Sequence, residues 1–388
     1  MRFLVRRFLI VMMAACSSPC FAAGMDVMKD FQGIAYTEQG SAVGLPMGGI
    51  GAGCIEITSK GTLAEFAHLN NWTLRIPSIK GTGLTLTYRT GAKTRVFPLG
   101  EQKVKFEGNF PFAKLTFPNL PVKLTLWCWS PFILHNARHS AYPVAIFDAE
   151  VVNTSKTKAE VGLALSYGTD YGAWTRYLAP DTLKDVPTIS MRSTPKLYSG
   201  KNVQGISFST VAEQNPVANY IYPNANADIT LSARTQANAK VFTYQVAKPD
   251  SIPDALTTGE TTAEANPTTY AVEQRSGLAP GKSGMIGLVA SWYAPSHFNY
   301  NGYRLGHKYE EWFKTSAAAA EEVARERESL LAKTKRDYDL IAKSTLPKWY
   351  REMVQSNFYL LPSTTWWTKD GISFTYESPN GCPLHGTM

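Results

Sequence analysis

The 388-residue sequence is poor in charged residues, in histidine and in cysteine. Charged side chains make up 18% and hydrophobic ones 44%, which excludes an intrinsically disordered chain, because such chains are rich in charge and poor in apolar residues. The six histidines are dispersed and no CxxC or HExxH motif occurs, so the spacing of a metal site is absent, and we expect neither a metal nor a cofactor. The 29 glycines and 23 prolines follow no period, which excludes a collagen-like chain.

The formal net charge of +8 is spread along the chain. Three of the charges, Arg2, Arg6 and Arg7, lie at the N-terminus, and no later stretch holds five basic residues in a row. A basic protein can bind nucleic acid or acidic glycans, but scattered lysines are more typical of a mildly basic protein outside the cytoplasm. We therefore expect no nucleic-acid partner.

Residues 1–23 have the pattern of a secretory signal peptide. The basic MRFLVRR is followed by the apolar FLIVMMAA and by small residues that allow cleavage after Ala22 or Ala23. The alternative is lipoprotein processing at Cys16. Both interpretations predict export, to the periplasm or the extracellular space. No later apolar run reaches 18 residues, so we expect no membrane span once the signal is removed.

Removal of the signal would leave three cysteines, Cys54, Cys128 and Cys382. With an odd number, at least one thiol is expected to be free or paired between chains. A disulfide between Cys54 and Cys128 is one of the open alternatives.

The segment GLPMGGIGAGCIEI, residues 44–57, contains five glycines. Part of it looks like the dinucleotide-binding pattern GxGxxG, but that pattern needs a preceding strand, a following helix and an acidic residue about 20 positions on. The residues that follow, CIEITSKGTLAEF, alternate as a strand and a turn do. We interpret the segment as a tight backbone bend against a packed surface and not as a phosphate site.

From about residue 80 to 295 the sequence predicts many short strands. The segment 122–129 alternates with period two, with Val122, Leu124, Leu126 and Cys128 on one face and Lys123, Thr125, Trp127 and Trp129 on the other. Turn clusters such as NTSKTK and PNANA separate such segments, and no helical pattern lies between them. This organisation predicts a mainly β fold, with an antiparallel β-sandwich domain over residues 24–303.

Residues 304–346 are predicted to form a linker helix. Their alanine-rich sequence favours a helix, and a partly apolar stripe runs along it: Val323, Arg327, Leu330, Thr334, Tyr338 and Ile341. Pro347 ends this helix and begins a second one, and Asp370-Gly371 predicts a hairpin turn further on. Two helices and a hairpin are too few to close a core, so we expect residues 347–388 to be the start of a domain that continues.

Glu377 is the candidate for chemistry. It follows the predicted strand 372–376 and lies close in sequence to Trp366 and Trp367, which are candidate substrate-binding residues. A carboxylate at a strand exit beside aromatic rings suits a sugar site, because such rings pack against the C–H faces of a pyranose and the acid acts at the anomeric carbon. His385, in the loop that follows, is a candidate base or donor. The alternative is that Glu377 and His385 are solvated surface residues and Asp370 a turn residue.

Three separated motifs resemble glycoside hydrolase family 116, the family of non-lysosomal glucosylceramidase (bile-acid β-glucosidase) and of microbial β-glucosidases. They are GLPMGGIGAGCIEI, the pair FPNLPVKLTLWCWSPFI and SAYPVAIFDAEVVN, and LPKWYREMVQSNFYLL, in the order of the family and from about residue 40 to 388. The resemblance implies an N-terminal β-sandwich followed by a C-terminal (α/α)6 barrel, of which residues 347–388 would be the first helices.

The resemblance also implies a chemistry. Members of the family cleave β-glucosides, some of them β-xylosides, with retention, through a glutamate nucleophile and an aspartate acid/base. FTYESPNGCPLHGTM resembles the nucleophile segment, which makes Glu377 the nucleophile candidate. The acid/base would belong to a barrel that is missing here and acts in cis. The sequence thus predicts an exported retaining β-glucosidase or glucosylceramidase-like hydrolase, inactive as these 388 residues alone, with a β-glucoside or other glycan as substrate.

Two other interpretations stay open. A non-catalytic carbohydrate-binding β-sandwich at the cell surface, with a lipid anchor as one form of attachment, would have the same strand pattern. Glycoside phosphorylases and glucoamylase-like enzymes also join a sandwich to such a barrel, and a phosphate requirement would indicate the former.

Overall fold

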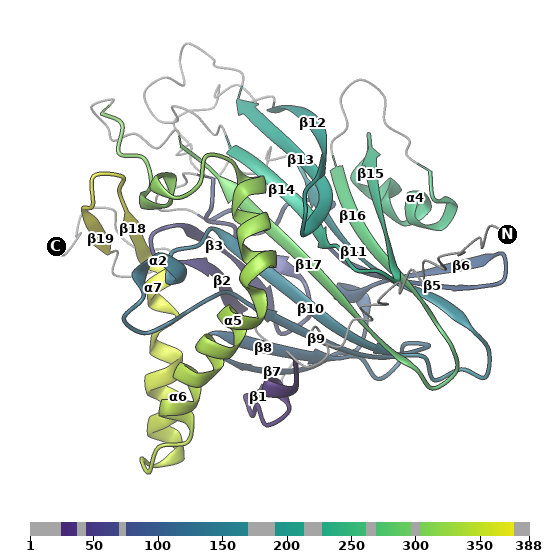
Figure 1. Cartoon of the computed structure of the whole chain (residues 1–388), viewed down its shortest axis with the longest axis horizontal. Helices are drawn as coiled ribbons and strands as arrows, with labels where there is room; N and C mark the ends of the chain where they lie inside the picture. The colour runs from purple at the N-terminus through teal and green to yellow at the C-terminus, as the bar shows by residue number, and fades with distance from the viewer. Residues whose placement is uncertain are drawn as a thin grey trace, which may run out of the picture.

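The chain forms two packed antiparallel β-sheets with helices on their outer faces (Figure 1). The computed structural model describes residues 25–36, 44–69, 75–169, 191–212, 227–260, 269–295 and 303–375. The predicted signal segment 1–23 and Cys382 lie outside these ranges. The mainly β fold class and the antiparallel β-sandwich are confirmed, whereas the (α/α)6 barrel stays a prediction.

The larger sheet has nine strands, all paired antiparallel. In spatial order they are β1 (Ile34–Tyr36), β7 (Lys105–Asn109), β8 (Phe112–Thr116), β9 (Lys123–Trp129), β10 (Val144–Val152), β17 (Ser283–Tyr293), β14 (Ala227–Arg234), β13 (Val203–Ala212) and β12 (Met191–Ser199). The second sheet has five: β15 (Ala239–Val246), β16 (Thr269–Leu278), β11 (Ala159–Gly168), β5 (Gly83–Thr90) and β6 (Lys93–Pro98).

Two small sheets and several helices complete the described part of the chain. The small sheets are β2 (Gly44–Gly49), β3 (Gly53–Thr58) and β4 (Leu63–Ala64), and the hairpin β18 (Thr365–Trp367) with β19 (Ser373–Thr375). The α-helices are α2 (Ala137–Ser140), α4 (Ile252–Thr258), α5 (Ser316–Ala342), α6 (Lys348–Asn357) and α7 (Leu360–Thr364). The 3-10 turns are η1 (Asp26–Met28), η2 (Leu99–Glu101), η4 (Pro249–Ser251) and η5 (Lys308–Glu311).

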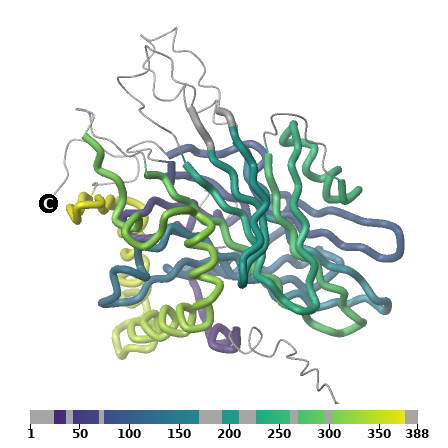
Figure 2. The backbone as a smooth tube through the Cα atoms, turned by 45° about the horizontal axis from the view of Figure 1, so that its top comes forward, coloured from purple at the N-terminus to yellow at the C-terminus, as the bar shows by residue number. Residues whose placement is uncertain are grey.

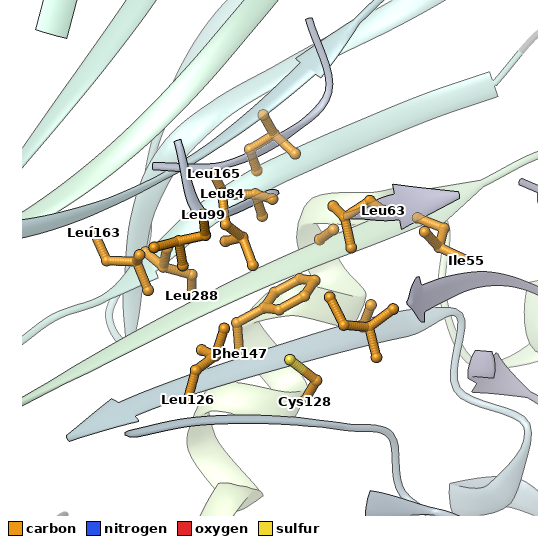
Figure 3. Close-up of a cluster of buried hydrophobic side chains, with 14 of the residues drawn as sticks. Ile55, Leu63, Leu84, Leu99, Leu126, Cys128, Phe147, Leu163, Leu165 and Leu288 are labelled. Carbon is orange, nitrogen blue, oxygen red and sulfur yellow. The ribbon is translucent and has the colours of Figure 1, made fainter. Parts of the chain in front are cut away.

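The main hydrophobic core lies between the two sheets. Figure 3 shows Phe147 and Leu126 of the larger sheet facing Leu163 and Leu165 of β11. The period-two pattern of β9 is confirmed, since Leu124, Leu126 and Cys128 belong to this core. The opposite face of the strand is also apolar, because Trp127 and Trp129 are buried in a second cluster on the outer side of the sheet.

Helix α5 covers that outer face, across β17, β14 and β13 (Figure 1). The stripe expected from the sequence is confirmed, because Val323, Leu330 and Tyr338 are buried in the second cluster. The helix begins with Thr315 as its N-cap, whose hydroxyl accepts a hydrogen bond from the Ala318 amide. The predicted linker helix is therefore packed along its length on the sandwich, while the predicted division of the chain into domains stays a prediction.

A buried ion pair joins α5 to the sheet. Arg327 and Asp148 of β10 are 2% and 1% exposed. The Nε of Arg327 lies 3.0 Å from Oδ1 of Asp148 and its Nη2 lies 2.7 Å from Oδ2, so the contact is bidentate. The indole N–H of Trp129 donates a third hydrogen bond to Asp148, at 2.7 Å. The charge of Asp148 is thus matched by a cation and an additional donor, as a buried carboxylate requires.

Helix α4 covers the outer face of the five-stranded sheet in the same way. Tyr244 and Ala271 pack against Leu256 of this helix. Glu273, fully buried beneath it, pairs with Arg275 at 2.7 Å and accepts a hydrogen bond of 2.6 Å from the Tyr244 hydroxyl. Both sheets are therefore sandwiched between the main core and a helix.

The alternative of a disulfide between Cys54 and Cys128 is wrong. Both cysteines are free and buried, each in the main core or beside it. Burial raises the pKa of the Cys54 thiol to about 12 and also raises that of Cys128, because a thiolate is disfavoured in an apolar environment. Neither thiol is reactive in the folded chain.

Within the described ranges every helix is too short or too polar to cross a lipid bilayer. The same ranges bring no three His, Cys, Asp or Glu side chains into an arrangement that could hold a metal ion.

We expect Arg327→Met to destabilise the fold by about 3–5 kcal/mol, because it leaves Asp148 buried without its cation. Urea unfolding followed by tryptophan fluorescence measures this loss. Arg325→Ala is the matched control on the exposed side of the same helix, where ion pairs contribute about 0–1 kcal/mol. Equal losses in the two variants would contradict the role of the buried pair.

Candidate functional site: aromatic residues around the C-terminal hairpin

The hairpin β18–β19 carries the two candidate tryptophans. The predicted turn at Asp370-Gly371 is confirmed, with Trp366 opposite Phe374 and Trp367 opposite Ser373. The turn is closed by the Thr368 amide, which donates to the Ile372 carbonyl at 2.9 Å. Thr375, paired with Thr365, is the last described residue of the chain, so Glu377 and His385 lie outside the described residues and their roles stay predictions.

Trp366 is a buried residue of this region. It is 5% exposed, and its ring lies against His307 with the centroids 5.1 Å apart. The His307 ring in turn stacks on Tyr309 at 4.8 Å and an angle of 10°. The ring of Trp366 therefore packs inside the described part of the chain, and its substrate-binding role stays a prediction.

Trp367 is half-buried and lies at the surface of the same cluster. Its ring meets Trp312 edge to face at 6.0 Å, and the ammonium group of Lys308 lies 5.8 Å from its centroid. The guanidinium group of Arg138 lies 5.9 Å from the Trp312 ring. Two partly exposed indoles flanked by two cations can stack on a sugar ring and donate hydrogen bonds to its hydroxyls.

The sequence pattern did not identify His307, Lys308 or Trp312. These residues lie just before α5, in a segment that the sequence analysis merged with the linker helix. The aromatic residues at 309, 312 and 313, immediately before the alanine-rich run, were the available signal. Their proximity to Trp367 depends on contacts between segments about 60 residues apart, which no local pattern encodes.

The glycine-rich segment underlies this hairpin, and its interpretation as a tight bend against a packed surface is confirmed. A Cβ on Gly49 would lie 2.3 Å from the backbone of Ala141. The Ile50 amide donates to the Ser140 carbonyl at 2.7 Å, and the Gly48 amide to the Ser130 hydroxyl at 2.8 Å. The backbone N–H groups of this bend are therefore used by protein partners and do not form a phosphate cradle.

The described carboxylates near the hairpin are already paired. Glu56 forms an ion pair with the buried Arg75. Burial raises the pKa of Glu56, and the charge of Arg75 opposes that shift. Glu310 pairs with Arg304 and accepts the His307 amide at 2.7 Å, in a capping box at the start of η5. Neither acid faces the indoles as a free nucleophile, so these carboxylates are structural.

Comparison with known proteins decides the family. The sequence profile described as beta-glucosidase 2, glycosyl-hydrolase family 116 N-term, matches residues 44–330. The chain belongs to this family. The match begins at β2, the first strand of the glycine-rich hairpin, and ends inside α5. It includes every strand of the two large sheets except β1, and the half of α5 that carries Arg327. A search of curated protein sequences finds no match.

Solved structures add only distant similarity to the family 116 assignment. A protein assigned as a kojibiose phosphorylase from the human microbiome is 10% identical with a TM-score of 0.39, over 86% of this chain and 35% of its own. The family GH92 alpha-mannosidase of Bacteroides thetaiotaomicron is 10% identical with a TM-score of 0.40, over 86% of this chain and 41% of its own. The chain thus spans well under half the length of these proteins.

His68, buried beneath the glycine-rich bend, makes the stability of the fold depend on pH. It is 2% exposed, its Nε2 lies 2.9 Å from the Tyr167 hydroxyl, and its ring lies 5.1 Å from that of Trp292. The indole N–H of Trp292 donates to the Ala52 carbonyl in the glycine-rich bend at 2.7 Å. Burial lowers the pKa of His68 to about 3. In the unfolded chain an imidazole titrates near 6.5, so the unfolded state binds the additional proton below that pH.

We therefore expect the stability contributed by neutral His68 to be complete above pH 6.5 and to fall as the pH is lowered towards 3. The loss is roughly 1.4 kcal/mol per pH unit, or about 2 kcal/mol between pH 6.5 and 5. His68→Gln keeps a polar partner for Tyr167 and should reduce the fall in unfolding free energy between pH 7 and 5 by this amount. His135→Asn, at an exposed histidine, is the control. An unchanged pH dependence in His68→Gln would refute the prediction.

Proposed function

We propose that this chain is the N-terminal part of an exported, retaining glycoside hydrolase that acts on β-glucosides, with glucosylceramide-like glycosides among its substrates. The observation that carries the proposal is the match to the N-terminal domain of glycosyl-hydrolase family 116 over residues 44–330. The signal-like segment 1–23, with lipoprotein processing at Cys16 as its alternative, supports export.

In the proposed reaction Glu377 is the nucleophile. Its carboxylate oxygen attacks the anomeric carbon and forms a glycosyl ester while the bond from that carbon to the aglycone oxygen breaks. An aspartic acid of the catalytic domain gives its proton to the leaving oxygen. The same aspartate then takes a proton from water, the water oxygen attacks the anomeric carbon, and the ester bond to Glu377 breaks, which restores both carboxyl groups.

In this proposal the 388 residues supply one of the two carboxyl groups, that of Glu377, and the proposal includes an (α/α)6 domain in cis that supplies the other. The described surface of α6 and its flanks supports a covering partner of this kind. Leu346, Trp349 and Met353 are exposed, Trp349 by 66%, and its ring lies 5.5 Å from that of Tyr350. On its other face α6 is fixed to the sandwich by Gln355, whose amide donates to the Phe110 carbonyl at 2.7 Å. An apolar patch on one face of a docked helix is typical of a surface that packs against further protein.

In this proposal Trp367 contributes to substrate binding and the neighbouring Trp312 extends the aromatic surface. His385 is proposed as a donor to a sugar hydroxyl. Trp366, in contrast, would act through the packing of the hairpin.

The nucleophile can be tested in the protein that joins this chain to its catalytic domain. We expect Glu377→Gln to lower kcat for p-nitrophenyl β-glucoside by at least about 1,000-fold, because the covalent intermediate can no longer form. Azide should restore turnover of Glu377→Gly and give the glycosyl azide of inverted configuration. Asp370→Asn, which changes a turn residue of the same hairpin, is the matched control and should retain activity. Full activity of Glu377→Gln would refute the assignment, and a requirement for phosphate would indicate a phosphorylase.

In this proposal the 388 residues alone should hydrolyse no glycoside, because the acid/base is assigned to the catalytic domain. Turnover of p-nitrophenyl β-glucoside by this chain in isolation would contradict the two-domain proposal.

A further inference from the structure

The glycine-rich bend and the C-terminal hairpin meet at Gly51, more than 300 residues before the hairpin in the chain. The Gly51 amide donates to the Thr365 hydroxyl at 2.9 Å. The Gly51 carbonyl lies 3.3 Å from Nδ1 of His307 and 3.5 Å from the Trp367 amide. Gly51 has a φ of +68°, and a Cβ there would lie 2.3 Å from both the backbone nitrogen and the Cβ of Trp367. Both the backbone conformation and the close approach therefore require glycine.

Thr365 connects three elements through one hydroxyl. It accepts the hydrogen bond from Gly51 and donates one to the Leu361 carbonyl of α7. Its backbone pairs with Thr375, the last described residue of β19. The side chain is 5% exposed, so loss of the hydroxyl would leave a buried amide and a buried carbonyl without their partner.

Two further contacts hold the same segment. Arg75, which is 7% exposed and paired with Glu56 of β3, donates from Nη2 to the Ser363 carbonyl at the end of α7, at 2.9 Å. At the far end of the hairpin, the Lys369 amide donates to the Leu305 carbonyl at 3.0 Å. The hairpin is thus fixed at its base by the small sheet β2–β3–β4 and near its turn by the segment before η5. Figure 2 shows this yellow end of the chain lying along one side of the sandwich, beside the purple N-terminal strands.

We propose that Gly51, Arg75 and Thr365 are positioning residues for the hydrolase reaction. Together they fix the base of β18–β19, and so the strand that leads into Glu377, two residues after Thr375. The inference takes the reaction from the proposed function. The contacts that support it are those of the described residues. It predicts that the sandwich contributes to the chemical step, because displacement of a nucleophile by about 1 Å can cost about 100-fold in rate.

The test compares Thr365→Val with Thr365→Ser. Valine keeps the shape of threonine and removes the hydroxyl, whereas serine retains it. In the protein with its catalytic domain, we expect Thr365→Val to lower kcat at least tenfold with KM changed less than about twofold, and Thr365→Ser to retain at least half of the wild-type kcat. Tyr244→Phe is the control for stability, because it removes a buried hydrogen bond beneath α4, on the other sheet. Its kcat, measured well below its unfolding temperature, should match the wild type.

A second measurement examines the contact without catalysis. Hydrogen exchange of the 388-residue chain should be at least tenfold faster in peptides covering 365–375 for Thr365→Val than for the wild type, and unchanged there for Tyr244→Phe. Faster exchange with a lower kcat supports the proposal.

Two outcomes would overturn it: unchanged exchange in Thr365→Val, or faster exchange with an unchanged kcat in an enzyme that Glu377→Gln inactivates. If the wild-type protein hydrolyses no glycoside, the proposed function fails and this catalytic role with it. The exchange data then report only on the anchoring of the hairpin, which distinguishes the two failures.

Discussion

The buried pair between Arg327 and Asp148 sets the position of the helices and the hairpin that follow the sandwich in the described part of the chain. The outer face of the nine-stranded sheet carries Trp127 and Trp129, so it must be covered, and α5 covers it. Apolar contact alone would allow the helix to slide or rotate, whereas a bidentate ion pair with a third donor from Trp129 is satisfied in one register only. Because α6, α7 and the hairpin follow α5 directly, this register also determines where they meet the sandwich.

Where the hairpin contacts the sandwich, glycines, which have no side chain, are as important as the larger residues. Gly49 lies against Ala141 and Gly51 against Trp367, at distances that any Cβ would prevent. The bend can therefore offer its amides and carbonyls directly to neighbouring segments, and it forms hydrogen bonds with Ser140, Ser130 and Thr365. A glycine-rich sequence that resembles a nucleotide-binding loop is thus explained by backbone packing between protein segments.

The sequence predicted features that depend on local periodicity and failed for those that depend on tertiary contacts. The alternation in β9, the stripe of α5 and the turn at Asp370-Gly371 were predicted correctly, because each depends on residues that are close in the sequence.

The alternative of a disulfide between Cys54 and Cys128 was wrong, because spacing does not show that each thiol is enclosed in packed apolar surroundings. Trp312 and His307 were missed, because their relation to Trp367 and Trp366 arises only when η5 and β18 come together. Burial also separates two tryptophans that are equivalent in the sequence, since Trp366 is enclosed and Trp367 reaches the surface.

In the proposed enzyme, these relations argue against an accessory role for the sandwich. A domain that only stabilised its neighbour would need a broad apolar interface, and the face of α6 around Trp349 has that character. The contacts of Gly51, Arg75 and Thr365 are different, because they are few, directional and buried, and they act on a short segment of 13 residues, 363–375. Directional hydrogen bonds fix position and orientation more than they contribute to net stability, since each replaces a bond to water. Their concentration at the base of one hairpin is therefore better explained by a need for position, which our proposed reaction gives to the strand before Glu377 and which a surface hairpin does not have.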